Sequence, residues 1–336
     1  MSLAGRATAI AHPNIALAKY WGKRPFGHNL PAVPSLSVTL AGLTTTTTVA
    51  FDDALAEDEL LLGGARAAAA DTRRVTGLLD RVRAAAGVRA RARVESANDF
   101  PTAAGLASSA SGFAALALAE SAAAGLTTAP EAVSDLARRT SVSAARSAFG
   151  GFVELRAGVQ GDEALAAAPL AGPESWPLSV VIAVTREGPK DVGSSDGMRH
   201  TVETSPYFPA WVEGAPALFA RIRAAVLARD LEALAGAAEA SALRMHASSL
   251  AAEPGLFYWT GATVEVALEV RRLRARGVPA FFTIDAGPHV KVFTAPASAD
   301  EVTRALRAVP GVIRTIAASP GEGARLAGAA PGARPA

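Results

Sequence analysis

The most informative local pattern in the sequence is Asn98-Asp-Phe-Pro-Thr-Ala-Ala-Gly-Leu-Ala-Ser-Ser-Ala-Ser-Gly112. Its small residues leave the backbone open, and it runs directly into an apolar pattern of helical spacing that begins at Phe113. Ser108 and Ser109 can cap that helix, whose positive N-terminal end attracts anions. The segment therefore favours a loop that holds a phosphate chain at the start of a helix.

Taken alone, this loop leaves a plainer interpretation open. Its spacing is not that of the P-loop, which needs Gly-Lys-Ser/Thr, nor that of the dinucleotide-binding fingerprint. An ordinary capped helix that packs tightly through small residues has the same composition. Other segments of the chain are needed to distinguish a phosphate-binding loop from an ordinary capped helix.

Composition narrows the class of protein. The 336 residues are half apolar and 19% charged, which suits a large core and two lobes. The net charge of +2, without a run of Lys or Arg, argues against nucleic-acid binding. The absence of cysteine excludes disulfides, a thiolate nucleophile and a Cys-based metal site. No uncharged apolar run reaches the roughly 18 residues of a membrane span, so we expect a cytoplasmic protein.

Periodicity predicts a mixed α and β chain. A turn-forming Gly172-Pro173 and Pro177 precede a buried strand, which places a lobe boundary there. We predict strands within residues 7–51, 89–96, 152–155, 178–185, 280–284 and 290–294, and helices over 73–85, 130–147, 208–228, 230–250 and around Val270. The predicted lobes are residues 1–176 and 177–318, followed by a disordered tail over 319–336.

Several polar segments could carry chemistry. Lys19-Tyr-Trp-Gly-Lys-Arg24 offers cations beside rigid aromatic walls, or else a solvated basic turn. Ser143 and Arg146 lie three apart on a helical face, where a guanidinium can bind carboxylate or phosphate, although capping and surface roles give the same pattern. A second polar loop that contains glycine, Lys190-Asp-Val-Gly-Ser-Ser-Asp-Gly-Met198, follows a buried strand.

Asp285 ends an apolar strand and precedes the turn residues Ala-Gly-Pro288. An acid at that position faces the space beyond the strand. It could act as a base, as a metal ligand or as a turn cap.

The order of these segments is more specific than any one of them. The chain contains Lys19-Tyr-Trp-Gly-Lys-Arg24, Phe100-Pro-Thr-Ala-Ala-Gly-Leu-Ala-Ser-Ser-Ala110, Ser141-Val-Ser-Ala-Ala-Arg-Ser-Ala-Phe-Gly-Gly-Phe152, Gly193-Ser-Ser-Asp-Gly-Met198, Val202-Glu-Thr-Ser205 and Asp285-Ala-Gly-Pro288. In this order they resemble the diphosphomevalonate decarboxylases of the GHMP kinase superfamily, over about residues 7 to 315.

The resemblance implies an α+β, two-lobed GHMP kinase fold, with a ribosomal-protein-like N-terminal lobe, a ferredoxin-like C-terminal lobe and the site between them. It implies a homodimer. The implied reaction converts mevalonate 5-diphosphate and ATP into isopentenyl diphosphate, carbon dioxide, phosphate and ADP, with Mg²⁺. The 3-hydroxyl is phosphorylated first, which supplies a leaving group β to the carboxylate.

The resemblance also implies site residues. Asp285 would orient and deprotonate the 3-hydroxyl, and Arg146 would hold the substrate carboxylate. The other implied substrate contacts are Tyr20, Trp21, Gly22, Lys23, Arg74, Ser141, Val142, Ser143, Ala144, Ala145 and Met198. The implied ATP contacts are Ala104, Gly105, Leu106, Ala107, Ser108, Ser109, Lys190 and Ser194. No metal ligand is implied.

Three departures from the family pattern leave the charged groups in place. Val142 and Ala145 replace a frequent Gly and Cys, and His289 replaces a frequent Asn. Three related functions remain as alternatives: a phosphomevalonate decarboxylase, a mevalonate 3-kinase and a catalytically dead ligand-binding member. Asp285 argues against kinases that lack it, and Lys23 with Arg74 favours a diphosphate over a monophosphate.

Overall fold

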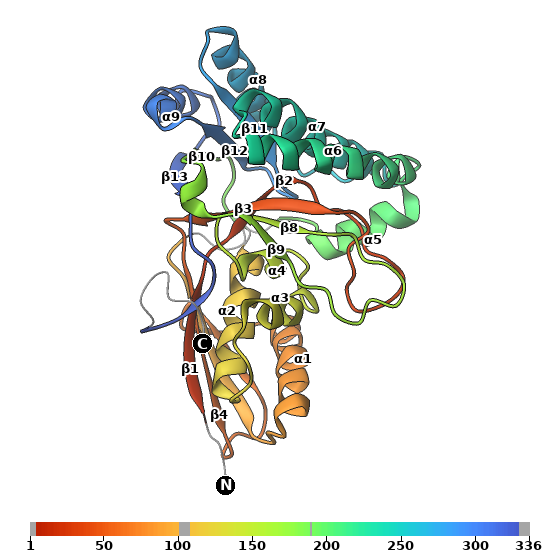
Figure 1. Cartoon of the computed structure of the whole chain (residues 1–336), viewed down its shortest axis with the longest axis vertical. Helices are drawn as coiled ribbons and strands as arrows, with labels where there is room; N and C mark the ends of the chain where they lie inside the picture. Colours follow the sequence, from red (N-terminus) through yellow and green to blue (C-terminus); the bar gives the residue numbers. More distant parts are fainter. Residues whose placement is uncertain (1–4, 101–107, 189, 329–336) are drawn as a thin grey trace.

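The computed structural model describes residues 5–100, 108–188 and 190–328 (Figure 1). It contains two β-sheets and flanking helices, which confirms the predicted α+β class. None of the described helices combines the length and the apolar character of a membrane span.

The first sheet has the strand order β14-β1-β4-β7-β5-β6. Its pairs are antiparallel except for β5 with β7. The strands are β1 Arg6–Ala11, β4 Thr45–Asp52, β5 Glu59–Leu62, β6 Ala65–Arg66, β7 Arg91–Asn98 and β14 Arg325–Leu326.

Two helices, α1 Ala69–Ala86 and α2 Ser108–Ala123, pack against this sheet at the lower end of Figure 1. In β4 every second side chain is buried, from Thr45 to Phe51, as expected for a strand with one covered face. The helix predicted after the small-residue loop is confirmed, and it starts at Ser108. The loop itself, over 101–107, lies outside the described residues.

The second sheet has the order β11-β12-β10-β13-β3-β8-β9, and β2 also pairs with β3. Every described pairing in it is antiparallel. The strands are β2 Asn14–Ala18, β3 Ser35–Ala41, β8 Phe152–Leu155, β9 Ala168–Ala171, β10 Ser179–Val184, β11 Ala280–Ile284, β12 Val290–Thr294 and β13 Arg314–Pro320.

Both faces of the C-terminal strands are covered, which explains their continuous apolar sequence. In β10, Val180 and Ile182 join a core with α6 and α7, whereas Val181 and Ala183 join a core with α8 and α9. These helices are α6 Phe208–Ala228, α7 Leu231–Leu250, α8 Gly261–Ala275 and α9 Ala299–Arg307.

The second sheet continues across the predicted lobe boundary at residues 176 and 177. Ser319 and Pro320 of β13 pair with Ala41 and Leu40 of β3, so strands from both halves of the sequence share one sheet. β2 and β3 therefore lie in the middle of the molecule in Figure 1, between the two groups of helices.

Three predicted elements differ from the structure. The expected disordered tail is ordered as far as residue 328, because Gly321 donates to Thr39 O at 2.8 Å and β14 pairs with β1; residues 329–336 lie outside the described residues. The helix predicted over 130–147 is two helices, α3 Pro130–Arg138 and α4 Ala144–Ser147, separated by a turn. The polar loop at 190–198 becomes helix α5 Ser194–Thr204.

The order of the tail depends on glycines that let two segments approach. A Cβ atom on Gly150 would lie 2.8 Å from the backbone nitrogen of Gly323, which is closer than real Cβ atoms come. Gly151, with φ +68°, also donates to Gly321 O at 2.8 Å.

Short 3₁₀ turns at Pro173–Ser175 and Pro296–Ser298 complete the fold.

Candidate active site

Asp285 follows β11 directly and lies between two lysines. Lys19 Nζ is 2.5 Å from Asp285 Oδ1, and Lys291 Nζ is 3.3 Å from Asp285 Oδ2. Both lysine side chains are buried, whereas 26% of the Asp285 side chain stays exposed. β2 leads into Lys19 and β12 carries Lys291, so three separate strands bring this triad together.

The three charges shift each other's ionisation. Burial alone would raise the pKa of Asp285, but the charges and hydrogen bonds of Lys19 and Lys291 outweigh it and hold this pKa well below its usual range. Burial lowers the pKa of Lys19 to about 8, against the opposing effect of Asp285. At neutral pH the site therefore presents an ionised carboxylate beside ammonium groups.

Arg146 lies in α4 and is held by two serines of β3. Its Nε donates to Ser37 Oγ at 2.9 Å and its Nη1 donates to Ser35 Oγ at 2.7 Å. Only 2% of the residue is exposed, and burial lowers its pKa to about 10 although Asp285 and Tyr20 oppose this. The guanidinium therefore remains charged at neutral pH and shares the electrostatic environment of Asp285.

The Tyr20 hydroxyl is buried without a hydrogen-bond partner among the described residues. Burial raises the pKa of this phenol, against the opposing charge of Arg146. Buried hydroxyls usually have a partner, so an unpaired one beside a charged arginine is typical of a position where a ligand completes the hydrogen bond.

Lys23, in the segment after β2, and Arg74, on α1, form a second positive region. Lys23 is exposed, and its pKa is lowered by partial burial and by the charge of Arg74, while Asp196 opposes the shift. Arg74 stands on α1 with its guanidinium carbon 4.7 Å from the centre of the Phe113 ring. Residues of α1, α5 and the segment after β2 therefore converge here.

Lys190 and Ser194 connect the α5 segment to the strand end at Asp285. Lys190 Nζ donates to Ser194 Oγ at 2.6 Å and to Ala286 O at 2.9 Å. Its pKa is lowered to about 8, first by burial and then by the charge of Lys291. The structure thus brings two predicted ATP contacts next to the predicted catalytic aspartate.

Trp21 and Met198 form part of one apolar cluster that also contains Ala286. The Trp21 ring lies edge-on to the Tyr258 ring at 5.9 Å, and Trp21 O accepts a hydrogen bond from Trp211 Nε1 at 3.0 Å. Because Ala286 directly follows Asp285, this apolar cluster lies beside the charged groups.

Other predicted contacts have limited side-chain roles. The side chains of Val142, Ala144 and Ala145 pack into the N-terminal core, so only their backbone could face a ligand. Gly22 has φ +96° and likewise offers backbone alone. Ser141 Oγ lies 3.2 Å from Ser143 Oγ. Ser108 and Ser109 begin α2, and Ser109 is exposed. Ala104, Gly105, Leu106 and Ala107 lie outside the described residues.

Sequence reasoning missed three residues that surround this site. Lys19 was grouped with nearby cations without an assigned role, and Lys291 and Tyr258 were not singled out. A lysine inside the otherwise apolar and buried strand Val290–Thr294 is a signal that could have found Lys291. Nothing in the sequence near Tyr258 marks it, because its place next to Trp21 depends on the tertiary fold.

Two family models match this chain. Residues 11–166 match the family model of the diphosphomevalonate decarboxylase-like N-terminal domain, and residues 180–319 match that of the mevalonate 5-diphosphate decarboxylase C-terminal domain. The chain belongs to the diphosphomevalonate decarboxylase family. The sequence-based resemblance to this family is thereby confirmed.

Individual family members are similar over most of their lengths. The diphosphomevalonate decarboxylase of Candida albicans is 36% identical over 88% of this chain and 86% of its own length. The human diphosphomevalonate decarboxylase is also 36% identical, over 85% of this chain and 76% of its own length.

Solved structures of the family share the fold. The mevalonate diphosphate decarboxylase of Enterococcus faecalis superposes with a TM-score of 0.88 at 38% identity, over 96% of this chain and 98% of that one. A structure described as "MDDEF in complex with MVAPP, AMPPCP and Magnesium" superposes with a TM-score of 0.90 at 39% identity and the same coverage. These matches confirm the two-lobed GHMP kinase fold.

Proposed function

We propose that this chain converts mevalonate 5-diphosphate and ATP into isopentenyl diphosphate, carbon dioxide, phosphate and ADP. The observation that carries the proposal is the ionised Asp285 held between Lys19 and Lys291 beside Arg146, in a member of the decarboxylase family. An acceptor for a hydroxyl proton and a binding group for a carboxylate are the two groups that this reaction requires.

Asp285 would receive the hydrogen bond of the substrate's tertiary 3-hydroxyl and then its proton. Its lowered pKa keeps it ionised at neutral pH but makes it a weak base. A weak base suffices in phosphoryl transfer, because the transition state is loose and the hydroxyl becomes acidic only as its bond to phosphorus forms. Lys19, 2.5 Å away, fixes the carboxylate in place.

Arg146 would hold the substrate carboxylate. After transfer, the C3–O bond breaks with phosphate as the leaving group, the bond between C2 and the carboxyl carbon supplies the electrons of the new double bond, and carbon dioxide departs. Arg146 and the neighbouring lysines can stabilise the departing phosphate, because buried cations act strongly where water is excluded. The unpaired Tyr20 hydroxyl lies in the same electrostatic environment.

Lys23 and Arg74 would bind the 5-diphosphate at the far end of the substrate. Both cations lie close enough for the charge of Arg74 to lower the pKa of Lys23, an arrangement that a bound anion would relieve. Two adjacent cations match the larger negative charge of a diphosphate better than the smaller charge of a monophosphate.

ATP would bind with its phosphates near Lys190, Ser194 and the start of α2, and with Mg²⁺. The described residues contain no group of three or more His, Cys, Asp or Glu side chains suited to hold a metal. They therefore fit a Mg²⁺ ion that is carried chiefly by the nucleotide phosphates, as is usual for this metal, and not one held in an all-protein cage. The ion would supply charge neutralisation on the transferred phosphate.

The test is a comparison of substrates. Purified protein is incubated with ATP, Mg²⁺ and either mevalonate, its 5-phosphate or its 5-diphosphate, and carbon dioxide and phosphate are measured together. We expect both products only with the 5-diphosphate. Turnover of the 5-phosphate, or phosphate without carbon dioxide, would instead indicate the related phosphomevalonate decarboxylase or 3-kinase. The homodimer that the resemblance implies and the cytoplasmic location expected from the sequence remain predictions, and sedimentation velocity tests the first.

A further inference from the structure

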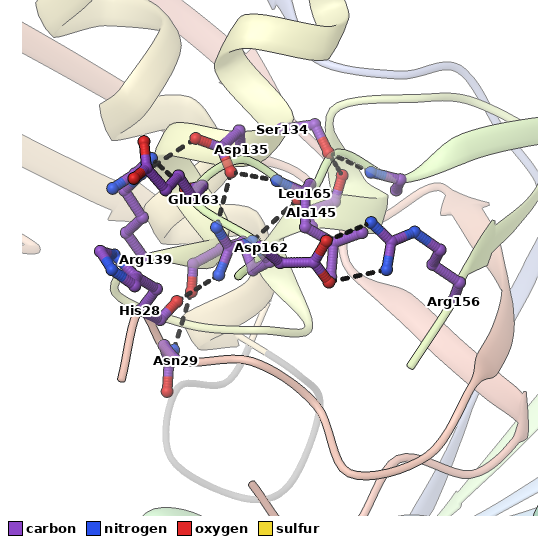
Figure 2. Close-up of polar contacts among 12 residues, drawn as sticks. His28, Asn29, Ser134, Asp135, Arg139, Ala145, Arg156, Asp162, Glu163 and Leu165 are labelled. Atoms are coloured by element: carbon purple, nitrogen blue, oxygen red, sulfur yellow. Dashed lines mark hydrogen bonds and ion pairs between the residues drawn. The ribbon is translucent and has the colours of Figure 1, made fainter. Parts of the chain in front are cut away.

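Arg138, the last residue of α3, is completely buried. It takes part in four hydrogen bonds besides those between backbone groups of the helix. Its guanidinium donates to Leu165 O at 2.8 Å, to His28 O, and to Asp135 Oδ1 at 2.6 Å. Its own backbone carbonyl accepts a hydrogen bond from Asn29 Nδ2 at 2.7 Å. Figure 2 shows this network, with His28 and Asn29 lying opposite Asp135 and Leu165.

Two of these partners form the tip of the loop that carries Lys23. His28 and Asn29 have φ of 51° and 56°, a left-handed conformation that costs energy in residues other than glycine. Tertiary contacts must therefore hold the tip. Among the described residues, the Arg138 guanidinium contacts His28 O, and the Arg138 backbone carbonyl accepts from Asn29.

The rest of the loop transmits that position to Lys23. Arg24 donates to Leu30 O at 2.8 Å, Ala32 donates to Gly22 O at 3.0 Å, and Lys23 forms a bridge with Pro31. Backbone hydrogen bonds thus join the two sides of the loop from its tip to its base. Residues 22 and 23 are therefore connected to residues 28 and 29 through these hydrogen bonds as well as through the chain.

A second segment, residues 156–165, also contacts this loop. Gly158 donates to Pro31 O at 2.9 Å, and a Cβ atom at Gly158 would lie 2.5 Å from the Leu30 side chain. Leu165, further along this segment, is bound by both Arg138 and Asp135. The loop is therefore enclosed between α3 and residues 156–165.

The same helix also fixes the segment that carries Arg146. Ser134 Oγ donates to Ala145 O at 2.8 Å and accepts a hydrogen bond from the backbone nitrogen of Ala167. Ser141 N donates to Ala137 O at 2.9 Å. α3 is thus tied at one end to the Lys23 loop and along one side to the residue that precedes Arg146.

We propose that Arg138, held by Asp135, is a positioning residue that sets the separation between Lys23 and Arg146. It has no recorded contact with Asp285, Lys23 or Arg146 and takes no direct part in the chemistry. This inference rests on the proposed function, in which Lys23 binds the diphosphate end of the substrate and Arg146 binds its carboxylate. The acyclic substrate is flexible, so anchoring its two ends holds the reacting 3-hydroxyl in place only while the two anchors keep a fixed spacing.

Removal of Arg138 should leave a folded protein. Asp135 would still accept hydrogen bonds from Arg139 Nε at 2.9 Å and from Leu165 N at 2.8 Å, so its charge is not left without a partner. Arg139 provides a matched control. It binds the same carboxylate and also Glu163 O, but it makes no recorded contact with His28 or Asn29.

The experiment compares Arg138→Met, Asn29→Gly and Arg139→Met in steady-state assays with both substrates varied. We expect Arg138→Met to raise the KM for mevalonate 5-diphosphate and lower kcat, for a combined fall in kcat/KM of roughly 10- to 100-fold, while the KM for ATP stays within about twofold. Asn29→Gly keeps the φ of the turn, because glycine adopts it freely. It removes a single hydrogen bond, whereas Arg138→Met removes the three that the guanidinium donates, so a smaller rise of about threefold is expected. Arg139→Met should stay within about twofold of the unmodified protein for both substrates.

Each outcome is decisive. Equal effects of Arg138→Met and Arg139→Met, a loss shared equally between the two substrates, or unchanged kinetics in Arg138→Met would overturn the inference. If Arg138→Met fails to fold, an unchanged KM in Asn29→Gly has the same force. Absence of turnover in the unmodified protein would refute the proposed function itself, and is thereby distinguished from failure of this inference.

Discussion

Lys19 and Asp285 lie 266 positions apart in the sequence, yet the ammonium of one and the carboxylate of the other meet at 2.5 Å. With Lys291 on the other carboxylate oxygen, this pair fixes both the orientation and the charge of Asp285. The site thereby holds an ionised carboxylate at neutral pH, although burial alone would favour the protonated form. The pH dependence of activity should report this balance.

Replacement of Lys291 by Met should move the acidic limb of the pH–activity profile to higher pH. The two lysines hold the pKa of Asp285 below its ordinary value, so removing one raises that pKa. Since activity requires the ionised carboxylate, activity is then lost at a higher pH as the solution is acidified. Profiles of kcat/KM that extend down to the lowest pH at which both proteins stay folded measure the shift. An unmoved acidic limb would show that Lys291 does not act on Asp285.

Replacement of Lys23 or Arg74 by Ala should raise the KM for the diphosphate substrate with little effect on that for ATP. Each variant loses one charge-assisted contact, worth about 1.5–3 kcal/mol when formed. Because Lys23 and Arg74 are exposed, we expect the lower end, close to tenfold. Arg73→Ala on the same helix, also exposed, serves as the control. A larger loss of ATP affinity would contradict this division of the cleft.

Arg146→Lys should bind substrate and lose much of the rate, because lysine keeps the charge but not the planar fork that engages Ser35 and Ser37. Arg146→Ala should lose more. Single-turnover product analysis locates the step that fails. Accumulation of the 3-phosphate intermediate assigns Arg146 to the elimination, whereas no accumulation assigns it to placing the 3-hydroxyl. Unchanged rates in both variants would remove Arg146 from the mechanism.

Much of this fold follows from sequence patterns because its helices and buried strands are strongly periodic. The strands at 280–284 and 290–294 coincide with β11 and β12, and the helices at 208–228 and 230–250 coincide closely with α6 and α7. The break between α3 and α4 was missed, because Thr140, Ser141 and Val142 interrupt the helix without Gly or Pro.

The site was harder to predict wherever it depends on tertiary contacts. The motifs named Asp285 and Arg146 because each stands in a distinctive local sequence. Lys291 and the order of residues 319–328 could not be found in this way. Lys291 gains its role from Asp285, which follows the neighbouring strand β11. Residues 319–328 are ordered by backbone hydrogen bonds to β3 and by close contact with Gly150 and Gly151.

Glu120→Gln should stabilise the protein increasingly as pH rises. Glu120 in α2 is fully buried, and neither carboxyl oxygen has a hydrogen-bond partner among the described residues. Burial raises its pKa well above the ordinary 4.5, against the opposing charge of Arg83. The folded state therefore keeps a proton that the unfolded state releases above about pH 4.5, and stability falls as pH rises from there towards the folded-state pKa.

Urea unfolding at several pH values tests this prediction. The free energy of unfolding of Glu120→Gln, minus that of the unmodified protein, should grow by up to about 1.4 kcal/mol per pH unit between pH 5 and the folded-state pKa. The control is Glu203→Gln, at an exposed position of α5, and it should give no such trend. A difference that stays constant with pH would mean that Glu120 is ionised in the folded protein.

The most direct test of the account is a rapid-quench single turnover of Asp285→Asn beside the unmodified protein, with labelled ATP and mevalonate 5-diphosphate. The unmodified protein should release one phosphate and one carbon dioxide per turnover. The variant should still bind both substrates and release neither at more than about 10⁻² to 10⁻⁴ of that rate, as expected for loss of a general base. Near-normal release of both products by Asp285→Asn would contradict the central claim that Asp285, held by Lys19, accepts the 3-hydroxyl proton.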